Sequence, residues 1–299
     1  MNKVQNEIVV QSLVGGHQID FYLRCLRSLL QNCQDPIELL VPSDGSLSGE
    51  DEDKILALFA DRKVSTVSFA DSTEKTLDEL EGKPNCQKFR EKSIWGIEFF
   101  DPLFAKPDDP FSFYLDADIL FIKPFTGLFD YEIVRGGCVF LQDTQWDAYS
   151  IRPWHMLGIG KTPSLVKGIT TAIVNWDKEV IDWDYLEWFL GQHRYHNIHE
   201  WIMPTAQAGL ASRCEAKTIV NTQVLNMYPN AKIREETFGL HFLGSYRKEW
   251  LKKFQKHKVS KHINTDPIRL RFENCKIQKP INYGLNQAKR WVNTRLNIW

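Results

Sequence analysis

The chain has 299 residues, of which 43% are hydrophobic, 12% aromatic and 25% charged, and its formal net charge is −1. This composition excludes a disordered or low-complexity chain, and no apolar run approaches the roughly 18 residues that a membrane-spanning helix needs. The apolar run near the start is too short for a secretory signal, and the six cysteines form no C-x-x-C pair. We therefore expect no zinc site, and reduced thiols in a cytoplasmic protein.

The small net charge hides an uneven distribution along the sequence. From His241 to the last residue there are 14 basic and 3 acidic side chains, whereas the first 240 residues carry 23 basic and 35 acidic ones. A basic tail on an acidic body predicts an anionic partner near the C-terminus, such as phosphate groups, nucleic acid or an anionic lipid surface. A solvated basic face is the alternative interpretation.

In chain order, the first part of the sequence alternates between strand and helix patterns. Strands are predicted at 7–13, 37–41 and 63–69, and helices at 20–33 and 48–60. Gly15 and Gly16, after the first apolar run, predict a turn. This order implies right-handed crossovers and a mostly parallel sheet, whose ligands bind beyond the carboxyl ends of the strands.

The rest of the sequence continues the α/β pattern. Further strands are predicted within 111–125, 136–143 and 168–177, and further helices at 89–100, 182–193 and 199–214. We expect residues 1–250 to form one domain. Residues 251–299 are predicted to form a helical, basic C-terminal extension that packs on this domain or on a membrane surface.

Two carboxylates interrupt the otherwise apolar segment FSFYLDADILFIKPF, residues 111–125. Asp116 and Asp118 project to the same side if the chain is extended there, because side chains alternate along a strand. Two like charges this close repel each other unless a cation lies between them. Hard oxygen ligands suit Mg²⁺ or Mn²⁺ with positions left open for substrate phosphates, so the pair predicts a metal site at the end of the strand.

The segment FYLDADILFIKPFTGLFD resembles the D-x-D segment of GT-A fold glycosyltransferases, especially the glycogenin and lipopolysaccharide galactosyltransferase group (glycosyltransferase family 8). HFLGSYRKEW, residues 241–250, is similar to that group's H-F-x-G-x-x-K-P-W segment. The resemblance implies a GT-A fold, with a single mixed, mostly parallel sheet flanked by helices and a Rossmann-like nucleotide-binding half. It also implies that His241 is the third protein ligand of the metal. Arg247 stands at the spacing of the lysine that touches the diphosphate, and Lys248 follows it, so either residue is a donor-binding candidate.

Weaker similarities suggest further donor-binding residues. VPSDGS resembles the D-G-S loop of another GT-A family (family 2), which implies that Asp44 meets the nucleoside. CQKFREKS lies where the family 8 enzymes place a basic residue that contacts the donor, so Arg90 and Lys92 are candidates. Asp116 is expected to contact the donor as well as the metal.

Three residues are candidates for the groups around the reacting carbon. Asp143 ends the apolar run GGCVFLQ, which places an acid at the carboxyl end of a strand. Glu200 occupies roughly the position of the Asp-Gln pair of the family 8 group, and Gln207 lies shortly after it. The resemblance to family 8 implies retention of configuration, whereas an inverting enzyme would need a carboxylate base; both outcomes stay open.

The predicted function is a metal-dependent glycosyltransferase that uses Mn²⁺ or Mg²⁺ and a nucleotide-sugar donor, with a UDP-sugar favoured. The expected acceptor is a carbohydrate or a lipid-linked hydroxyl. No nucleic acid partner is expected. The basic tail is a candidate for peripheral contact with an anionic membrane. A sugar-phosphate nucleotidyltransferase shares the architecture but would need basic residues after the first strand, which LVGGHQIDF lacks. A non-catalytic nucleotide-sugar binding protein is the other alternative.

Overall fold

The computed structural model describes residues 8–143, 149–156, 162–196, 199–244, 246–254 and 266–295. Its strands are β1 (Ile8–Gln11), β2 (Ile37–Pro42), β3 (Val64–Val67), β4 (Phe111–Leu115), β5 (Ile119–Phe121), β6 (Phe125–Thr126), β7 (Gly137–Gln142), β8 (Leu165–Val166), β9 (Ile169–Asp177), β10 (Glu215–Ile219), β11 (Val224–Asn226), β12 (Gly239–His241), β13 (Ile268–Arg269), β14 (Phe272–Asn274) and β15 (Ile277–Gln278). Its α-helices are α1 (Ile19–Asn32), α2 (Gly49–Leu58), α3 (Phe69–Glu79), α4 (Pro84–Lys92), α5 (Ile94–Phe104), α6 (Tyr131–Val134), α7 (Trp183–Leu190), α8 (Ile202–Ala211), α9 (Arg247–Phe254) and α10 (Pro280–Arg295). Short 3₁₀ helices are η1 (Pro153–Met156), η2 (Lys178–Val180), η3 (His193–Tyr195) and η4 (His199–Trp201).

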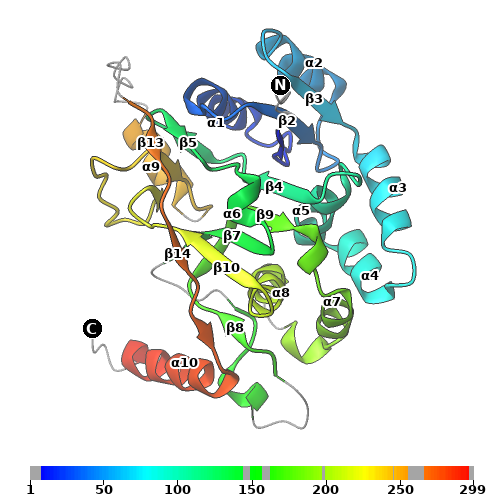
Figure 1. Cartoon of the computed structure of the whole chain (residues 1–299), viewed down its shortest axis with the longest axis vertical. Coiled ribbons are helices and arrows are strands. Elements are labelled where there is room, and N and C mark those ends of the chain that lie inside the picture. Colours follow the sequence, from blue (N-terminus) through cyan, green and yellow to red (C-terminus); the bar gives the residue numbers. More distant parts are fainter. Residues whose placement is uncertain are drawn as a thin grey trace.

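A main sheet runs through the middle of the molecule (Figure 1) in the order β14-β10-β7-β9-β4-β1-β2-β3. The strands β3, β2, β1, β4, β7 and β10 share one direction, whereas β9 and β14 run antiparallel to their neighbours. The carboxyl ends of β1, β2 and β4 therefore meet at one edge, where ligands of such sheets bind.

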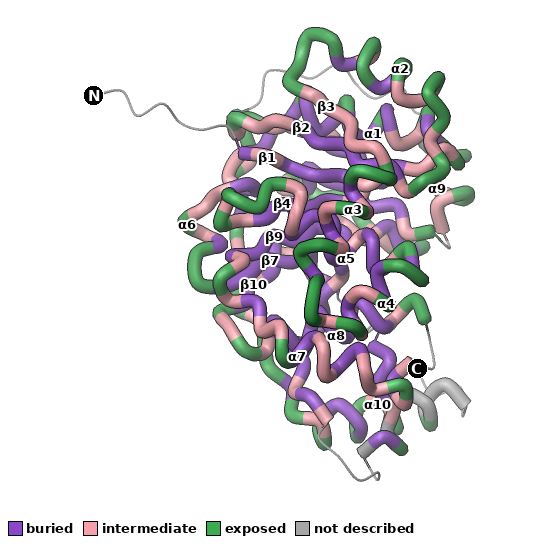
Figure 2. The backbone as a smooth tube through the Cα atoms, turned by 90° about the vertical axis from the view of Figure 1, so that its right-hand side faces the viewer, coloured by how far each residue is buried: buried purple, intermediate pink, exposed green. Residues whose placement is uncertain are grey.

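Both faces of this sheet are covered, which explains why its central strands are apolar along their whole length. In β7, Cys138 and Phe140 enter the core cluster under α4, α5, α7 and α8, whereas Val139 and Leu141 enter the cluster under α1. This alternation follows from the two-residue period of a strand. Figure 2 shows the buried strands between the exposed helical surfaces.

A second, smaller sheet links two segments that are far apart in the sequence. β5 pairs with β12 in antiparallel register, which places His241 opposite Ile119, and β12 also pairs with β11. Because β5 follows β4 after only three residues, this pairing brings His241 to the carboxyl end of β4. The small sheet is thus the element that positions a distant histidine beside the D-x-D segment.

The C-terminal segment adds strands as well as a helix. β13 pairs with β6, β14 pairs antiparallel with β10 as the edge strand of the main sheet, and β15 pairs with β8. The predicted α/β architecture, a mostly parallel sheet flanked by helices, is confirmed. The expectation of a purely helical tail is corrected, because the short strands at 268–278 precede α10. Residues 255–265 and 296–299 of the predicted extension lie outside the described residues, and the proposed division at residue 250 stays a prediction.

Among the helices that the structure describes, none has the length and apolar character needed to cross a bilayer.

Candidate functional site

The two aspartates lie where β4 ends and the chain turns into β5. The backbone N–H of Asp116 still donates to the carbonyl of Ala172 at 2.8 Å, which continues the pairing with β9. The phenol of Tyr114 donates to Asp116 Oδ1 at 3.0 Å. Asp118 is 6% exposed, so one of the two carboxylates is taken almost completely out of solvent.

His241 completes the group, and we refer to Asp116, Asp118 and His241 as the Asp-His cluster. His241 Nε2 lies 3.4 Å from Asp118 Oδ1 and 3.8 Å from Asp116 Oδ2. One ligand atom from each residue lies within 4.8 Å of the other two, a spacing at which a single ion can contact all three. Burial lowers the pKa of His241 and outweighs the opposing effect of Asp118, so the ring is neutral at physiological pH.

Asn226 determines which ring nitrogen of His241 faces the aspartates. The Nδ2 of Asn226 donates to the carbonyl of Gln142 at 3.1 Å, so its Oδ1 is the atom 2.7 Å from His241 Nδ1. An amide oxygen can only accept, so the proton of the neutral ring is on Nδ1. The lone pair on Nε2 is therefore directed at the two carboxylates, which is the orientation of a metal-ligating histidine supported by a second hydrogen bond. Sequence analysis did not identify Asn226.

The Asp-His cluster fits a divalent cation on chemical grounds. Asp118 Oδ1 is buried and has no hydrogen-bond partner among the described residues, although His241 Nε2 lies beside it. Two acceptors that face each other without a proton between them repel, and a bound cation would satisfy both. Burial, followed by the charge of Asp118, raises the pKa of Asp116. One imidazole and two carboxylates suit Mn²⁺, and the oxygen ligands alone would suit Mg²⁺.

Arg247 is the cation that contacts this cluster in the structure. Its Nη2 forms an ion pair with Asp118 Oδ2, and its Nη1 lies 3.1 Å from the hydroxyl of Tyr22 and 3.3 Å from Gln18 Oε1. Arg247 thus joins the metal-site candidate to the start of α1. Lys248, the other predicted diphosphate ligand, is exposed.

A buried polar group behind the aspartates was missed by sequence analysis. Glu98 on α5 lines a small cavity with Tyr114, Thr171 and the predicted Gln207. Glu98 Oε1 and Gln207 Oε1 are both buried without a hydrogen-bond partner among the described residues. Burial first, and then the charges of Asp116 and Asp118, raise the pKa of Glu98 well above its usual value, which favours its protonated form. Its signal in the sequence is an isolated acid within the apolar stretch IWGIEFF.

The other two predicted catalytic residues differ in their surroundings. Asp143 follows β7, is 9% exposed, and accepts a hydrogen bond from the hydroxyl of Tyr228 at 2.9 Å. Asn226, which contacts His241, also donates to the carbonyl of Gln142, the residue before Asp143, so Asp143 lies near the Asp-His cluster. Glu200 lies in η4 and is exposed.

Asp44 lies at the carboxyl end of β2, next to the first turn. Its backbone N–H donates to the carbonyl of Val14 at 3.1 Å, and its Oδ1 accepts from Ser46. A Cβ at Gly15 would lie 2.2 Å from Asp44 Oδ2, so any other residue there would force this carboxylate to move. Asp44, which is predicted to contact the nucleoside, and the predicted turn at Gly15 therefore form one local structure.

The two basic candidates of α4 are placed differently. The guanidinium of Arg90 binds both oxygens of Asp101, with Nε–Oδ1 and Nη2–Oδ2 distances of 2.9 and 2.8 Å, and Arg90 is 2% exposed. This pair braces α4 against α5, and the structure does not bring Arg90 into contact with the Asp-His cluster. Lys92 is exposed at the end of α4.

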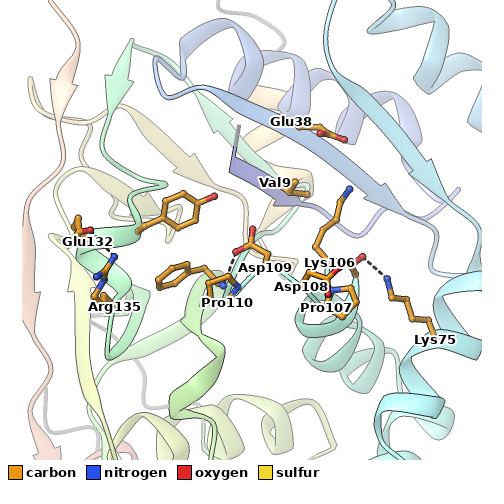
Figure 3. A pocket seen from close by; sticks show the side chains of 13 residues that line it. Val9, Glu38, Lys75, Lys106, Pro107, Asp108, Asp109, Pro110, Glu132 and Arg135 are labelled. Atoms are coloured by element: carbon orange, nitrogen blue, oxygen red, sulfur yellow. Dashed lines mark hydrogen bonds and ion pairs between the residues drawn. The ribbon is translucent and has the colours of Figure 1, made fainter. Parts of the chain in front are cut away.

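A wide hollow of about 990 Å³ lies elsewhere in the molecule (Figure 3). It is lined by Val9 and Glu38 near the starts of β1 and β2, and by Asp109 just before β4. These positions are at the amino ends of the parallel strands, opposite to the edge that carries the Asp-His cluster. Its charges are partly paired, as with Arg135 and Glu132 at 2.9 Å. Ligands of such sheets bind at the carboxyl ends of the strands, so this hollow is not where the principal ligand is expected.

The fold is that of a known class of solved structures. The chain has the GT-A fold of glycosyltransferases. Mouse xyloside xylosyltransferase 1 is similar with a TM-score of 0.56 and 13% identity, over 80% of this chain and 98% of that chain. The galactosyltransferase LgtC, in complex with donor and acceptor sugar analogues, is similar with a TM-score of 0.50 and 12% identity, over 79% of this chain and 87% of that chain. The glycosyltransferase GlyE of Streptococcus pneumoniae is similar with a TM-score of 0.50 and 9% identity, over 85% of this chain and 61% of that chain.

At identities this low, the likeness establishes the fold alone. No protein-family model matches the chain, and no curated protein matches it.

Proposed function

We propose that the protein is a metal-dependent glycosyltransferase that moves a sugar from a nucleotide-sugar donor, with a UDP-sugar favoured, to an acceptor hydroxyl. The observation that carries this proposal is the convergence of Asp116, Asp118 and a neutral His241 with its Nε2 lone pair directed at both acids. The GT-A fold supports it. A bound Mn²⁺ or Mg²⁺ would neutralise the charge that develops on the diphosphate leaving group.

The chain's own residues suggest how the donor is held. Asp44, beside Gly15 at the first turn, is proposed to bind the nucleoside, with Lys92 as a further donor-binding candidate. Arg247 is proposed to leave Asp118 when a cation binds there and to bind the diphosphate, because its pairs with Asp118 and Tyr22 hold it at the mouth of the site. Lys248 is the alternative residue for this role.

The groups around the reacting sugar are proposed from the same edge of the sheet. Asp143 and Gln207 are both buried, Gln207 lines a small cavity with Glu98, and the protonated form of Glu98, which its raised pKa favours, can donate a hydrogen bond. Glu200 stays a candidate on the exposed rim. Retention and inversion of configuration both remain open, because an acid that is held by Tyr228, as Asp143 is, can serve as a base or only position the sugar.

The acceptor is proposed to be a carbohydrate or a lipid-linked hydroxyl. We further propose that the protein acts in the cytoplasm and that its basic C-terminal segment makes peripheral contact with an anionic membrane, because residues 241–299 carry 14 basic against 3 acidic side chains.

A thermal-shift screen of nucleotide sugars with and without Mn²⁺ tests the proposal. We expect a UDP-sugar to raise the melting temperature only when Mn²⁺ is present, and Asp118→Asn to abolish this rise, because a neutral amide binds cations far less well than a carboxylate. Asp61→Asn, an exposed aspartate remote in sequence, is the matched control. Stabilisation that persists in Asp118→Asn would refute the assignment of the site.

A donor hydrolysis assay separates the remaining alternatives. Slow release of UDP from the donor that stabilises the protein would support transfer chemistry. Tight binding without turnover across a donor panel would instead support a non-catalytic nucleotide-sugar binding protein. Incorporation of a sugar phosphate into a nucleotide sugar with release of diphosphate would support a nucleotidyltransferase.

A further inference from the structure

Helix α10 presents a row of apolar side chains to solvent. Ile281, Leu285, Ala288 and Val292 follow one another at spacings of four, three and four residues, which places them in one stripe along the helix. All four are exposed, with Ile281 at 62%, Leu285 at 64% and Val292 at 43%. We refer to these four residues as the α10 stripe.

Helix α10 is packed on the body of the protein, so the exposure of the stripe is not due to a detached helix. α10 is held to the body by a different face, on which Tyr283 is 1% exposed and its ring lies 5.7 Å from the ring of Tyr149. Gln287 Nε2 donates to the hydroxyl of the same Tyr283 at 2.9 Å. The α10 stripe is therefore a second apolar surface of the helix, separate from the one that packs on the protein.

Two segments next to α10 also expose large apolar side chains. Ile277 in β15 is 57% exposed, and Trp154 in η1, which lies against α10, is 62% exposed. Five of the nine large apolar side chains that the described chain exposes belong to the α10 stripe or to these two residues. Scattered apolar residues on a surface are ordinary, but three large ones in one stripe of a helix, with two more in adjoining segments, indicate an interaction surface. Figure 1 shows α10 at the end of the long axis opposite to α2.

The charge around the stripe has a single sign. Residues 276–295 include five lysines and arginines and no aspartate or glutamate. Lys276, Lys279 and Lys289 are exposed beside the apolar residues. A helix with an apolar stripe and only cationic charges is the pattern of helices that lie in the interface of an anionic membrane.

We propose that the α10 stripe, with Ile277 and Trp154, docks the protein on an anionic lipid surface. This inference rests on the membrane contact proposed above and names the surface that makes it. The apolar side chains enter the headgroup region, while the lysines remain among the lipid phosphates. A lipid surface fits better than a peptide or a second protein, because the stripe lies on the outside of a helix that carries no acidic side chain to pair with a partner's bases.

Sedimentation of the full-length protein with lipid vesicles tests this proposal. One set of vesicles contains phosphatidylcholine alone, and the other contains equal parts of phosphatidylcholine and phosphatidylglycerol. We expect binding to the anionic vesicles at low salt, weaker binding at high salt, and little binding to the neutral vesicles. The double variant Ile281→Gln with Leu285→Gln should reduce partitioning into the anionic vesicles by about tenfold or more, because two of the inserting side chains become polar.

A matched control removes exposed apolar residues elsewhere. Leu56→Gln with Ile233→Gln changes side chains of similar exposure, 45% and 48%, and should leave vesicle binding unchanged. All variants are expected to keep the Mn²⁺-dependent stabilisation by the donor, so a failure of docking is distinguishable from a failure of the proposed transferase function. Equal binding to both kinds of vesicle, or equal binding by wild type and the α10 double variant, would overturn the proposal. So would a wild-type dimer in sedimentation velocity that the α10 substitutions convert to a monomer without any vesicle binding.

Discussion

Arg247→Met should make the protein bind Mn²⁺ more tightly when no nucleotide is present. In the structure, the guanidinium of Arg247 forms an ion pair with Asp118 Oδ2, and the two side chains are 15% and 9% exposed. A metal ion that binds Asp118 must displace this pair. A hydrogen bond between charged, largely buried groups contributes about 1.5–3 kcal/mol. Removing it should therefore raise Mn²⁺ affinity by about tenfold to a hundredfold.

Titration calorimetry with MnCl₂ and the nucleotide-free protein measures this effect. Lys248→Met is the matched control, because it removes one positive charge from the next residue, which is exposed. The general effect of lost positive charge is common to both variants, so the difference between them isolates the direct contact with Asp118. In the presence of Mn²⁺, Arg247→Met should instead bind UDP more weakly than wild type, since the proposed ligand of the diphosphate has been removed.

Two results would refute this reasoning. If Arg247→Met binds Mn²⁺ no more tightly than Lys248→Met does, then Arg247 does not compete with the metal for Asp118. If UDP binds Arg247→Met as well as wild type in the presence of Mn²⁺, then the guanidinium does not move to the diphosphate, and Lys248 becomes the better candidate.

Three other predictions concern the same edge of the sheet. Asn226→Ala removes the acceptor that keeps the proton of His241 on Nδ1, so Mn²⁺ affinity measured by calorimetry should fall by about 10- to 100-fold; an unchanged affinity would show that the ring orients itself. Burial and the charge of Asp118 raise the pKa of Asp116 to about 8, so the carboxyl must lose a proton before it binds metal, and affinity should decrease as the pH falls from 8.5 to 6.5, by up to about tenfold per unit. A flat pH profile would contradict this. Gly15→Ala would place its Cβ 2.2 Å from Asp44 Oδ2 and force the Asp44 carboxylate to move, so UDP should lose part of its stabilising effect in thermal shift while Mn²⁺ affinity is kept; equal UDP stabilisation would argue against Asp44 as a nucleoside ligand.

The parts of the fold that the sequence predicts are those in which local pattern and tertiary role agree. β1, β2, β7 and β9 coincide within a few residues with the predicted strands, because strands inside a sheet that is covered on both faces are rich in apolar residues. The half-buried edge strand β3 also lies within its predicted range. The acids at 116 and 118 were recognisable because charge is rare at the end of an apolar strand. His241 was found through a motif resemblance, and the pairing of β12 with β5 is the physical reason that it lies beside the aspartates.

The rest depends on contacts that a linear pattern does not encode. Asn226 is one polar residue among many until its amide is placed between His241 and the carbonyl of Gln142. Glu98 looks like an ordinary helical residue in the sequence, and only the folded structure shows that its Oε1 is buried. Arg90 matched the position of a donor ligand, but its charge is used by Asp101 in a helix-to-helix contact. β10 and β14 were missed because β10 is a short edge-proximal strand and β14 is stabilised mainly by pairing with it.

The antiparallel pairing of β14 with β10 gives the middle of the C-terminal extension a protective role. β14 occupies hydrogen-bonding groups along Lys217–Ile219 that would otherwise form an open sheet edge. Truncation after residue 250 would expose the backbone N–H and C=O groups of β10. The same strand of a second molecule could then pair with them, which commonly leads to aggregation. A truncated protein should therefore end beyond residue 274, so that β14 remains paired with β10.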